Sequence, residues 1–165
     1  MRTFGICLLM CLTLVLSGCG QSKFISYDGP AVTQVFISKS NRKLYLLHGE
    51  EILREYKVDL GFEPLGHKAE SGDGRTPEGY YWIDTRNPNS AFHLSLRVSY
   101  PNSKDIARAK ALGVDPGGDI FIHGQPNLLR AGGPDWTAGC IAVTNGEMEE
   151  IYAMVTDMTP IYIAP

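Results

Sequence analysis

The spacing of apolar and polar side chains predicts a strand-rich fold. Two short apolar runs, residues 35–37 and 43–47, are separated by five polar residues, a pattern typical of a β-hairpin. Alternation over residues 52–60 predicts a third strand with one mostly apolar face. A longer alternation runs from Phe92 to Tyr100 and places His93 on the polar face of a fourth strand.

The rest of the pattern adds short strands and two helices. Ser103 is expected to cap a helix that Gly113 ends, and Thr144 with Glu147 has the spacing of a capping box for a second helix. Further strands are expected at residues 80–83, 119–123, 140–144 and 161–163. The predicted fold class is therefore mainly β with two short helices (α+β).

Two long segments rich in glycine and proline interrupt the pattern, at residues 61–79 and 124–139. Long loops in compact domains tend to carry function. We expect the strands flanking the second loop to be antiparallel neighbours, which would bring His123, at the end of one, beside Cys140, at the start of the next.

The N-terminus has the features of an export signal: Arg2, an apolar stretch over residues 4–16, and small residues before Cys19. The stretch is shorter than the about 20 apolar residues that a membrane-spanning helix needs. Residues 16–19, Leu-Ser-Gly-Cys, resemble a bacterial lipobox, which implies lipidation of Cys19; an ordinary signal peptide is the alternative. Gly20 after the cysteine suggests the periplasmic face of an outer membrane.

These features predict three segments: a signal peptide at residues 1–18, a lipidated N-terminus and polar tether at 19–32, and a catalytic domain at 33–165. The 165 residues are 44% hydrophobic and 20% charged, which fits one globular domain. The formal net charge of −3 argues against nucleic acid as a partner.

Cys140 is the only cysteine that this processing leaves free. Cys7 and Cys11 depart with the signal, and Cys19 carries the lipid, so Cys140 has no disulfide partner. It could be a small buried apolar side chain. Its pairing with His123 favours a nucleophile and its general base, held as a thiolate–imidazolium ion pair.

Neighbouring glycines complete this candidate site. We expect the Gly124 carbonyl, or another nearby backbone oxygen, to orient the His123 ring, and the small Gly139 to let backbone N–H groups approach a developing oxyanion. One such donor is typically worth about 3 kcal/mol.

The pair His123-Gly124, followed after a spacer by Thr137-x-Gly139-Cys140-Ile141, resembles the signature of the L,D-transpeptidase catalytic domain (YkuD). The segment Arg75–Tyr81 resembles the upstream Thr-Pro-x-Gly motif of the same family, and the similarity extends from Thr33 to the C-terminus. The resemblance implies a mixed β-sheet sandwich with the catalytic cysteine at a strand start beside a cleft. It also implies a thioester with a peptidoglycan stem peptide that passes to an amine acceptor in cell-wall remodelling, with no cofactor.

Two positions depart from the common family pattern, because Ala138 stands for a histidine and Ala142 for an arginine. The motif Asp135-Trp-Thr-Ala-Gly-Cys-Ile-Ala-Val-Thr-Asn145 instead resembles a sub-branch with members thought to hydrolyse links to peptidoglycan. A hydrolase that releases a protein or a D-amino acid is therefore the first alternative. A non-catalytic peptidoglycan-binding lipoprotein is the second, and a wall-attached protein is a further possible partner.

Four more residues are candidates for substrate binding. Arg75 could bind a carboxylate or be a solvated loop charge, and His67 could meet the substrate from its loop. Trp136 and Thr137 precede the cysteine, where Trp136 could form a wall of the cleft or pack under the loop. No histidine pair has the spacing of a zinc site, so we expect no metal.

Overall fold

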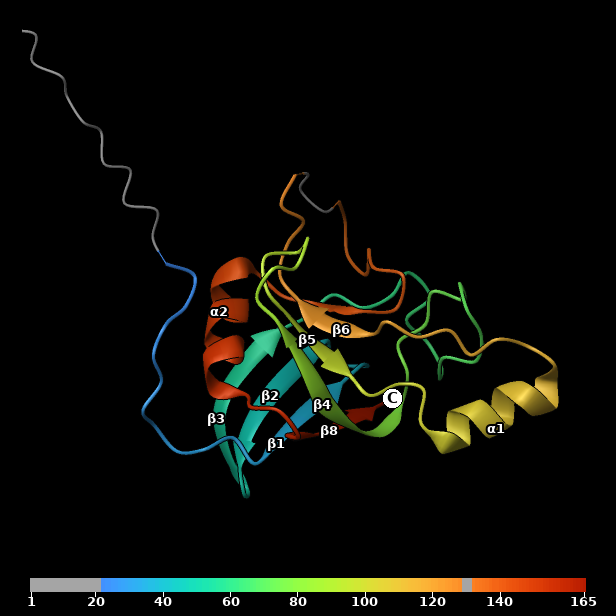
Figure 1. Cartoon of the computed structure of the whole chain (residues 1–165), viewed down its shortest axis with the longest axis horizontal. Coiled ribbons are helices and arrows are strands. Elements are labelled where there is room, and N and C mark those ends of the chain that lie inside the picture. Colours follow the sequence, from blue (N-terminus) through green and yellow to red (C-terminus); the bar gives the residue numbers. More distant parts are fainter. Residues whose placement is uncertain (1–21, 129–131) are drawn as a thin grey trace, which may run out of the picture.

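The computed structural model describes residues 22–128 and 132–165, which form eight strands and two helices (Figure 1). The mainly β fold with two helices is confirmed. The elements in chain order are β1 Gln34–Ser38, β2 Lys43–His48, β3 Glu51–Lys57, β4 Gly79–Asn87, β5 Ser95–Val98, α1 Ser103–Leu112, β6 Phe121–His123, β7 Ile141–Ala142, α2 Asn145–Met154 and β8 Pro160–Ala164.

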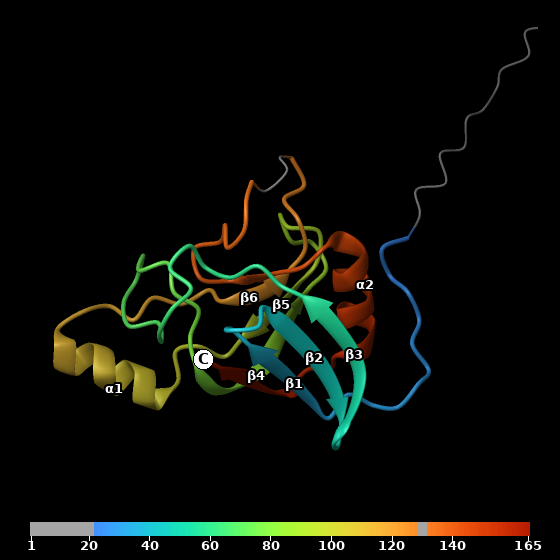
Figure 2. The same cartoon turned by 180° about the vertical axis from the view of Figure 1, so that it is seen from behind.

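All eight strands belong to one curled sheet in the order β3-β2-β1-β8-β4-β5-β6-β7, and Figure 2 shows the β3-β2-β1 part of it. Strand β4 joins the two halves: its first residues pair with β8, and its last residues, after a bulge between Ile83 and Thr85, pair with β5. The inward side chains from both halves share one core. Fully buried members include Val35, Ile37, Leu44, Leu46, Ile83, Leu96, Val98, Ile122, Ile141, Ile161 and Ile163.

The two helices lie at opposite ends of the molecule in both views (Figures 1 and 2). Thr144 caps α2, and Glu147 completes the capping box, as expected. The prediction for α1 was one residue off, because Asn102 is the N-cap and forms a capping box with Asp105. Gly113 ends α1 in the left-handed conformation, as expected.

Two predicted strands are shorter than their sequence patterns. In β3 only Tyr56 is buried, and Ile52 is 57% exposed. The first residues of the apolar face predicted for residues 52–60 therefore do not pack in the core. Strand β5 begins at Ser95 rather than Phe92. His93 has a positive φ of 70° in the preceding loop, and its Nε2 contacts Glu149, so its placement on a strand face was wrong.

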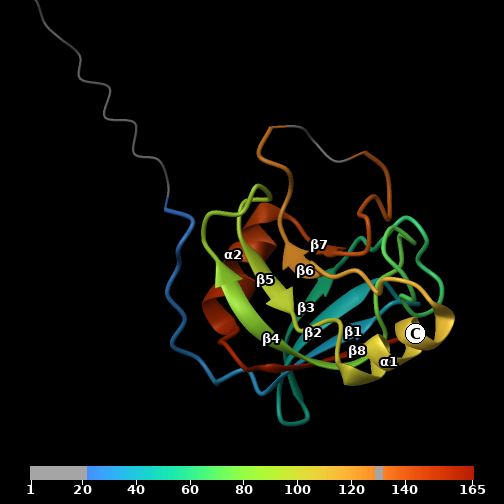
Figure 3. The same ribbon diagram turned by 45° about the vertical axis from the view of Figure 1, so that its right-hand side comes forward.

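The expected antiparallel pairing around the second loop was also wrong. Strands β6 and β7 are parallel, with Ile122 opposite Ile141 and His123 opposite Ala142 (Figure 3). A parallel pair needs a crossover of a dozen or more residues, and the loop between these strands is long enough to provide it.

The described part of the N-terminal segment lies against the domain. Lys23 donates to the carbonyls of Pro88 and His93, and the Phe24 ring contacts the Tyr152 ring of α2. The predicted signal peptide and Cys19 lie outside the described residues. Within the described residues, no helix is long and apolar enough to cross a membrane.

Candidate active site

One cleft of about 360 Å³ contains both predicted reactive residues. Its wall is largely apolar, and the rings of Phe92 and Trp136 pack near the His123 ring and near each other. The lining residues are Asn87, Ser90, Phe92, Ser95, Asp119, Phe121, His123, Trp136, Thr137, Ala138 and Cys140. They come from the end of β4, the start of β5 and the connection between them, from β6 and the residues before it, and from the segment that precedes β7.

His123, the last residue of β6, is only 4% exposed. Its Nδ1 lies 2.7 Å from the carbonyl oxygen of Gly124. A carbonyl can only accept, so Nδ1 carries the proton and Nε2 keeps a free lone pair. Burial lowers the pKa of His123 more than the Gly124 contact raises it, so the ring is neutral near neutral pH.

Gly124 is itself held tightly at the end of β6. Its N–H donates to the carbonyls of Phe92 and Leu94, and a Cβ there would lie 2.6 Å from Oδ1 of Asn145. A larger residue would displace the carbonyl that orients His123. The glycine therefore fixes the tautomer of the ring through its backbone.

Cys140 directly precedes β7. In the parallel register it lies opposite Phe121, while Ala142, two positions further on, lies opposite His123. Side chains at such diagonal positions share one face of the sheet and remain within reach of each other. The Cys140 thiol donates to the Asp119 carbonyl at 3.4 Å. Burial raises the pKa of Cys140, which, with the neutral His123, favours a neutral thiol–imidazole pair over the ion pair expected from the sequence.

Thr137 braces the turn that presents Cys140. Its hydroxyl donates to the carbonyl of Cys140 at 2.8 Å and accepts from the N–H of Gly139 at 3.2 Å. The Gly139 amide is thus already engaged, whereas no acceptor for the Cys140 N–H is found in the part of the chain that the structure describes. The amide of the nucleophile itself is therefore the better placed oxyanion donor.

The backbone around Gly139 has no room for a side chain. Gly139 has a φ of 127°, and a Cβ there would lie 2.7 Å from the carbonyl oxygen of Arg75. Gly61, which bridges to Thr137, is packed as tightly against Gly74. The long loop at residues 61–79 therefore supports the cysteine turn from behind.

A buried lysine anchors this loop to the sheet. Lys39 is 2% exposed, and its ammonium donates to the carbonyls of Gly66 and Thr76 and to the carboxylate of Glu78 at 2.7 Å. Such a buried charge is tolerable because every donor has an acceptor. Lys39 thus links β1 to the loop that backs the cysteine.

The residues before Thr137 are tied to the other side of the domain. Arg42 binds the carboxylate of Asp135 through Nε and Nη2, and Asp135 also accepts from the Leu60 N–H at 2.9 Å. Burial alone would raise the pKa of Asp135, but these donors lower it. Asp135 therefore fixes the approach of the chain to Trp136, whose buried Nε1 has no partner among the described residues.

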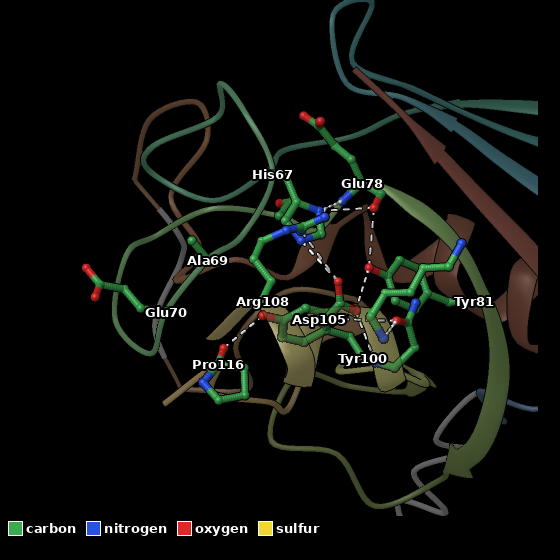
Figure 4. A network of polar contacts seen from close by, with 12 residues as sticks. His67, Ala69, Glu70, Glu78, Tyr81, Tyr100, Asp105, Arg108 and Pro116 are labelled. Atoms are coloured by element: carbon green, nitrogen blue, oxygen red, sulfur yellow. Dashed lines mark hydrogen bonds and ion pairs between the residues drawn. The ribbon is translucent and has the colours of Figure 1, made fainter. Parts of the chain in front are cut away.

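His67 and Arg75 lie outside the lining of this cleft. His67 contacts the Glu78 backbone, and its Nε2 lies 3.1 Å from Oδ1 of the buried Asp105 in a separate network with Tyr81 (Figure 4). Arg75 contributes its backbone carbonyl behind Gly139, and its buried Nε has no acceptor among the described residues. Trp136 and Thr137 do line the cleft.

Sequence reasoning missed several residues of the cleft. Phe92 was placed on a strand, although it lies in the loop before β5 and packs on His123 with ring centroids 4.5 Å apart. Asp119 was assigned to a strand and given no role, and its positive φ of 55° is not readable from a single sequence.

Across residues 22–128 and 132–165 no group of three acidic, histidine or cysteine side chains could hold a metal ion.

Comparison with known proteins finds similar sequences and similar solved structures. A family model described as the L,D-transpeptidase catalytic domain (YkuD) matches residues 33–163. YafK of Escherichia coli (strain K12), whose name assigns it provisionally to the L,D-transpeptidases, is 30% identical over 131 residues, covering 77% of this chain and 48% of that protein.

Two solved structures are also similar. The helical cell shape determining protein Pgp2 from Campylobacter jejuni gives a TM-score of 0.63 at 26% identity, covering 85% of this chain and 50% of that chain. Bd1075 from Bdellovibrio bacteriovorus gives a TM-score of 0.58 at 27% identity, with 85% and 50% covered. The present chain thus spans about half the length of the relatives that it matches.

Proposed function

Because this chain belongs to the L,D-transpeptidase catalytic-domain (YkuD) family, we propose that it is a peptidoglycan-modifying cysteine acyltransferase. The observation that carries the proposal is that Cys140 and His123 line one cleft, with Nδ1 of the ring engaged by Gly124. This leaves Nε2 to act as the base. A non-catalytic binding protein would have no need for this arrangement.

In the first step, Cys140 attacks the carbonyl carbon of the third residue of a stem peptide. The thiol must turn from the Asp119 carbonyl toward His123, whose Nε2 takes the proton as the carbon–sulfur bond forms. The Cys140 N–H stabilises the resulting oxyanion. His123 then returns its proton to the nitrogen of the terminal D-amino acid, which leaves as the thioester forms.

In the second step, an amine acceptor attacks the thioester and gives a cross-link or a wall-attached protein. His123, again neutral, removes a proton from the attacking nitrogen, and Cys140 leaves as the thiol. The largely apolar wall of Phe92, Phe121 and Trp136 supports transfer, because it disfavours ordered water near the acyl group.

Hydrolysis at the same site is the second candidate. It is favoured by Ala138 and Ala142, which replace the histidine and arginine of the common motif. We therefore propose that the chain belongs to the sub-branch that shares its motif at residues 135–145, which has members thought to hydrolyse links to peptidoglycan. Ala142 is fully buried opposite His123. Water in place of the amine would release a shortened stem or a protein.

Product analysis tests the function and separates the two outcomes. Purified protein and its Cys140→Ala variant are incubated with muropeptides, with and without an added amine acceptor, and the products are identified by mass spectrometry. Transfer predicts acceptor-dependent cross-linked or conjugated products that the variant does not form. Shortened stems alone would favour hydrolysis, and identical products from both proteins would reject the proposal.

We also propose that the domain acts in the cell envelope, anchored through a lipid on Cys19. The lipobox-like residues 16–19 support this placement. Metabolic labelling with a fatty-acid probe tests it: label should be incorporated by the full chain and be lost in Cys19→Ala. Equal labelling of both would reject the lipid anchor.

A further inference from the structure

Asp119 places an acidic group inside an otherwise uncharged cleft. Its side chain is exposed, and it lines the same cavity as Cys140 and His123. His123 is neutral, so Asp119 carries the one formal charge among the described lining residues near neutral pH. The other described lining side chains are aromatic, aliphatic, hydroxyl, thiol or amide groups.

The backbone of Asp119 lies beside the nucleophile. Asp119 has a φ of 55°, a left-handed conformation that few residues other than glycine, asparagine and aspartate adopt readily. In this conformation its carbonyl accepts from the Cys140 thiol at 3.4 Å. The side chain therefore starts from a backbone position that directly contacts the reacting sulfur.

Within the described residues, the Asp119 carboxylate has no hydrogen-bond or ion-pair partner. Arg97, which is near enough to be influenced by the charge of Asp119, and Lys68, which influences Cys140, are both engaged elsewhere. Arg97 on β5 binds Asp84 through Nε at 2.8 Å and Nη2 at 3.1 Å. Lys68 is buried and binds Asp73 at 2.8 Å. Asp119 is thus not explained by a structural ion pair in the part of the chain that is described.

We propose that Asp119 binds a primary ammonium group of the substrate and so selects amine-bearing stem peptides at the Cys140 site. A carboxylate beside an apolar wall attracts a cation more strongly than one in open water, because less water screens the pair. The inference rests on the proposed acyl transfer. The amine could belong to the side chain of the acyl donor or to the acceptor, and both present the same chemistry.

Charged thiol reagents test the recognition without any peptidoglycan. Cys140 reacts with 2-aminoethyl methanethiosulfonate, which carries a primary ammonium, or with neutral methyl methanethiosulfonate; each forms a mixed disulfide and releases methanesulfinate. The ratio of the two rates reports the preference for a cation. A substitution that changes the intrinsic reactivity of the thiol alters both rates equally, so that change cancels in the ratio. Asp119→Asn should lower this ratio about fivefold, the effect of a partly screened ion pair.

The controls make this result specific. Asparagine tolerates the same left-handed backbone, so Asp119→Asn preserves the turn. Asp157→Asn makes the same change in net charge at an exposed turn outside the cleft and should leave the ratio unchanged. An Asp119→Asn ratio equal to that of the unaltered protein would overturn the proposal.

Stem peptides then identify the source of the amine. Release of the terminal amino acid is measured with donors whose side-chain amine is free or acetylated, and transfer is measured with an amine acceptor at several concentrations. A donor site predicts that Asp119→Asn lowers kcat/KM about fivefold for the free-amine donor alone, and an acceptor site predicts a higher KM for the acceptor alone. If neither changes, Asp119 does not select the substrate.

Failure of the proposed function gives a different result. In that case Cys140→Ala would process stem peptides as the unaltered protein does, or neither would process them, while the reagent ratio would still report on Asp119. The two proposals can therefore fail independently.

Discussion

The Nδ1 atom of His123 lies 2.7 Å from the carbonyl oxygen of Gly124, the next residue in the chain. This contact takes the place of the carboxylate that orients the histidine in many catalytic triads. A carbonyl fixes the tautomer but adds no full negative charge to stabilise an imidazolium. Together with burial, it leaves His123 a neutral base beside a neutral thiol.

The protonation state predicts the pH dependence of the site. The pKa of His123 lies below its ordinary 6.5, and the pKa of Cys140 lies above its ordinary 9.0, in both cases chiefly because of burial. Acylation should therefore fall only as pH drops below about 6.5 and His123 becomes protonated.

Ultraviolet difference spectra against Cys140→Ser measure the thiolate directly. The thiolate signal should be absent near neutral pH and should rise only above about pH 9. Strong thiolate absorbance at neutral pH would instead reveal a preformed ion pair.

Removing the Thr137 hydroxyl should weaken both stability and activity. Thr137→Val keeps the shape but leaves the buried Gly139 N–H without its acceptor, which should cost about 1–3 kcal/mol of unfolding free energy. The turn that presents Cys140 also loses its brace, so kcat should fall. Thr137→Ser retains the hydroxyl, so its losses of unfolding free energy and of kcat should be smaller than those of Thr137→Val. Denaturant unfolding and steady-state assays measure the two quantities. Equal losses in the two variants would assign the effect to packing.

Adding a methyl group at Gly139 should disrupt the cysteine turn. The φ of 127° strains any other residue, and the new Cβ would meet the Arg75 carbonyl at 2.7 Å. Gly139→Ala should lower the unfolding free energy by about 2 kcal/mol or more and slow Cys140 labelling. Gly118→Ala, where no atom lies within 4 Å of the new Cβ, should stay within about 0.5 kcal/mol of the unaltered protein.

Asp73 should make the loop at residues 61–79 sensitive to acid. Burial alone would raise the pKa of Asp73, but the Lys68 ammonium and three backbone N–H groups lower it from 3.8 to about 2. A lowered carboxyl pKa adds stability above the unfolded value, and this stability is lost as pH falls toward about 2.

Asp73→Asn should therefore lower the unfolding free energy by about 2 kcal/mol near neutral pH. The difference from the unaltered protein should shrink between pH of about 4 and about 2 in denaturant unfolding. Asp157→Asn serves as the control for net charge, and a difference that does not change with pH would contradict the assignment.

Much of the fold was readable from local pattern. The hairpin of β1 and β2 followed from two short runs separated by a polar turn, and the capped helix α2 followed from Thr144 with Glu147, because these signals act within a few residues. The direction of β7 was not readable in this way. It depends on the crossover and on pairing with Asp59, far away in the sequence.

The cleft was only partly predictable for the same reason. His123 and Cys140 could be named from their chemistry, and Trp136 from its place in the motif. Asp119 and Phe92 enter the cleft through backbone turns rather than through strand alternation, as their loop positions and the positive φ of Asp119 show. His67 was predicted to meet the substrate from its loop but instead contacts Asp105 and the Glu78 backbone, partners that no local pattern indicates.

Thioester formation at Cys140, with His123 as the base, can be detected by intact-protein mass spectrometry after incubation with a stem-peptide donor, followed by peptide mapping. One acyl adduct is expected on the peptide that contains Cys140, with no adduct in Cys140→Ala and much slower adduct formation in His123→Gln. An adduct that persists in Cys140→Ala, or no adduct on the unaltered protein while the donor is consumed, would contradict this mechanism.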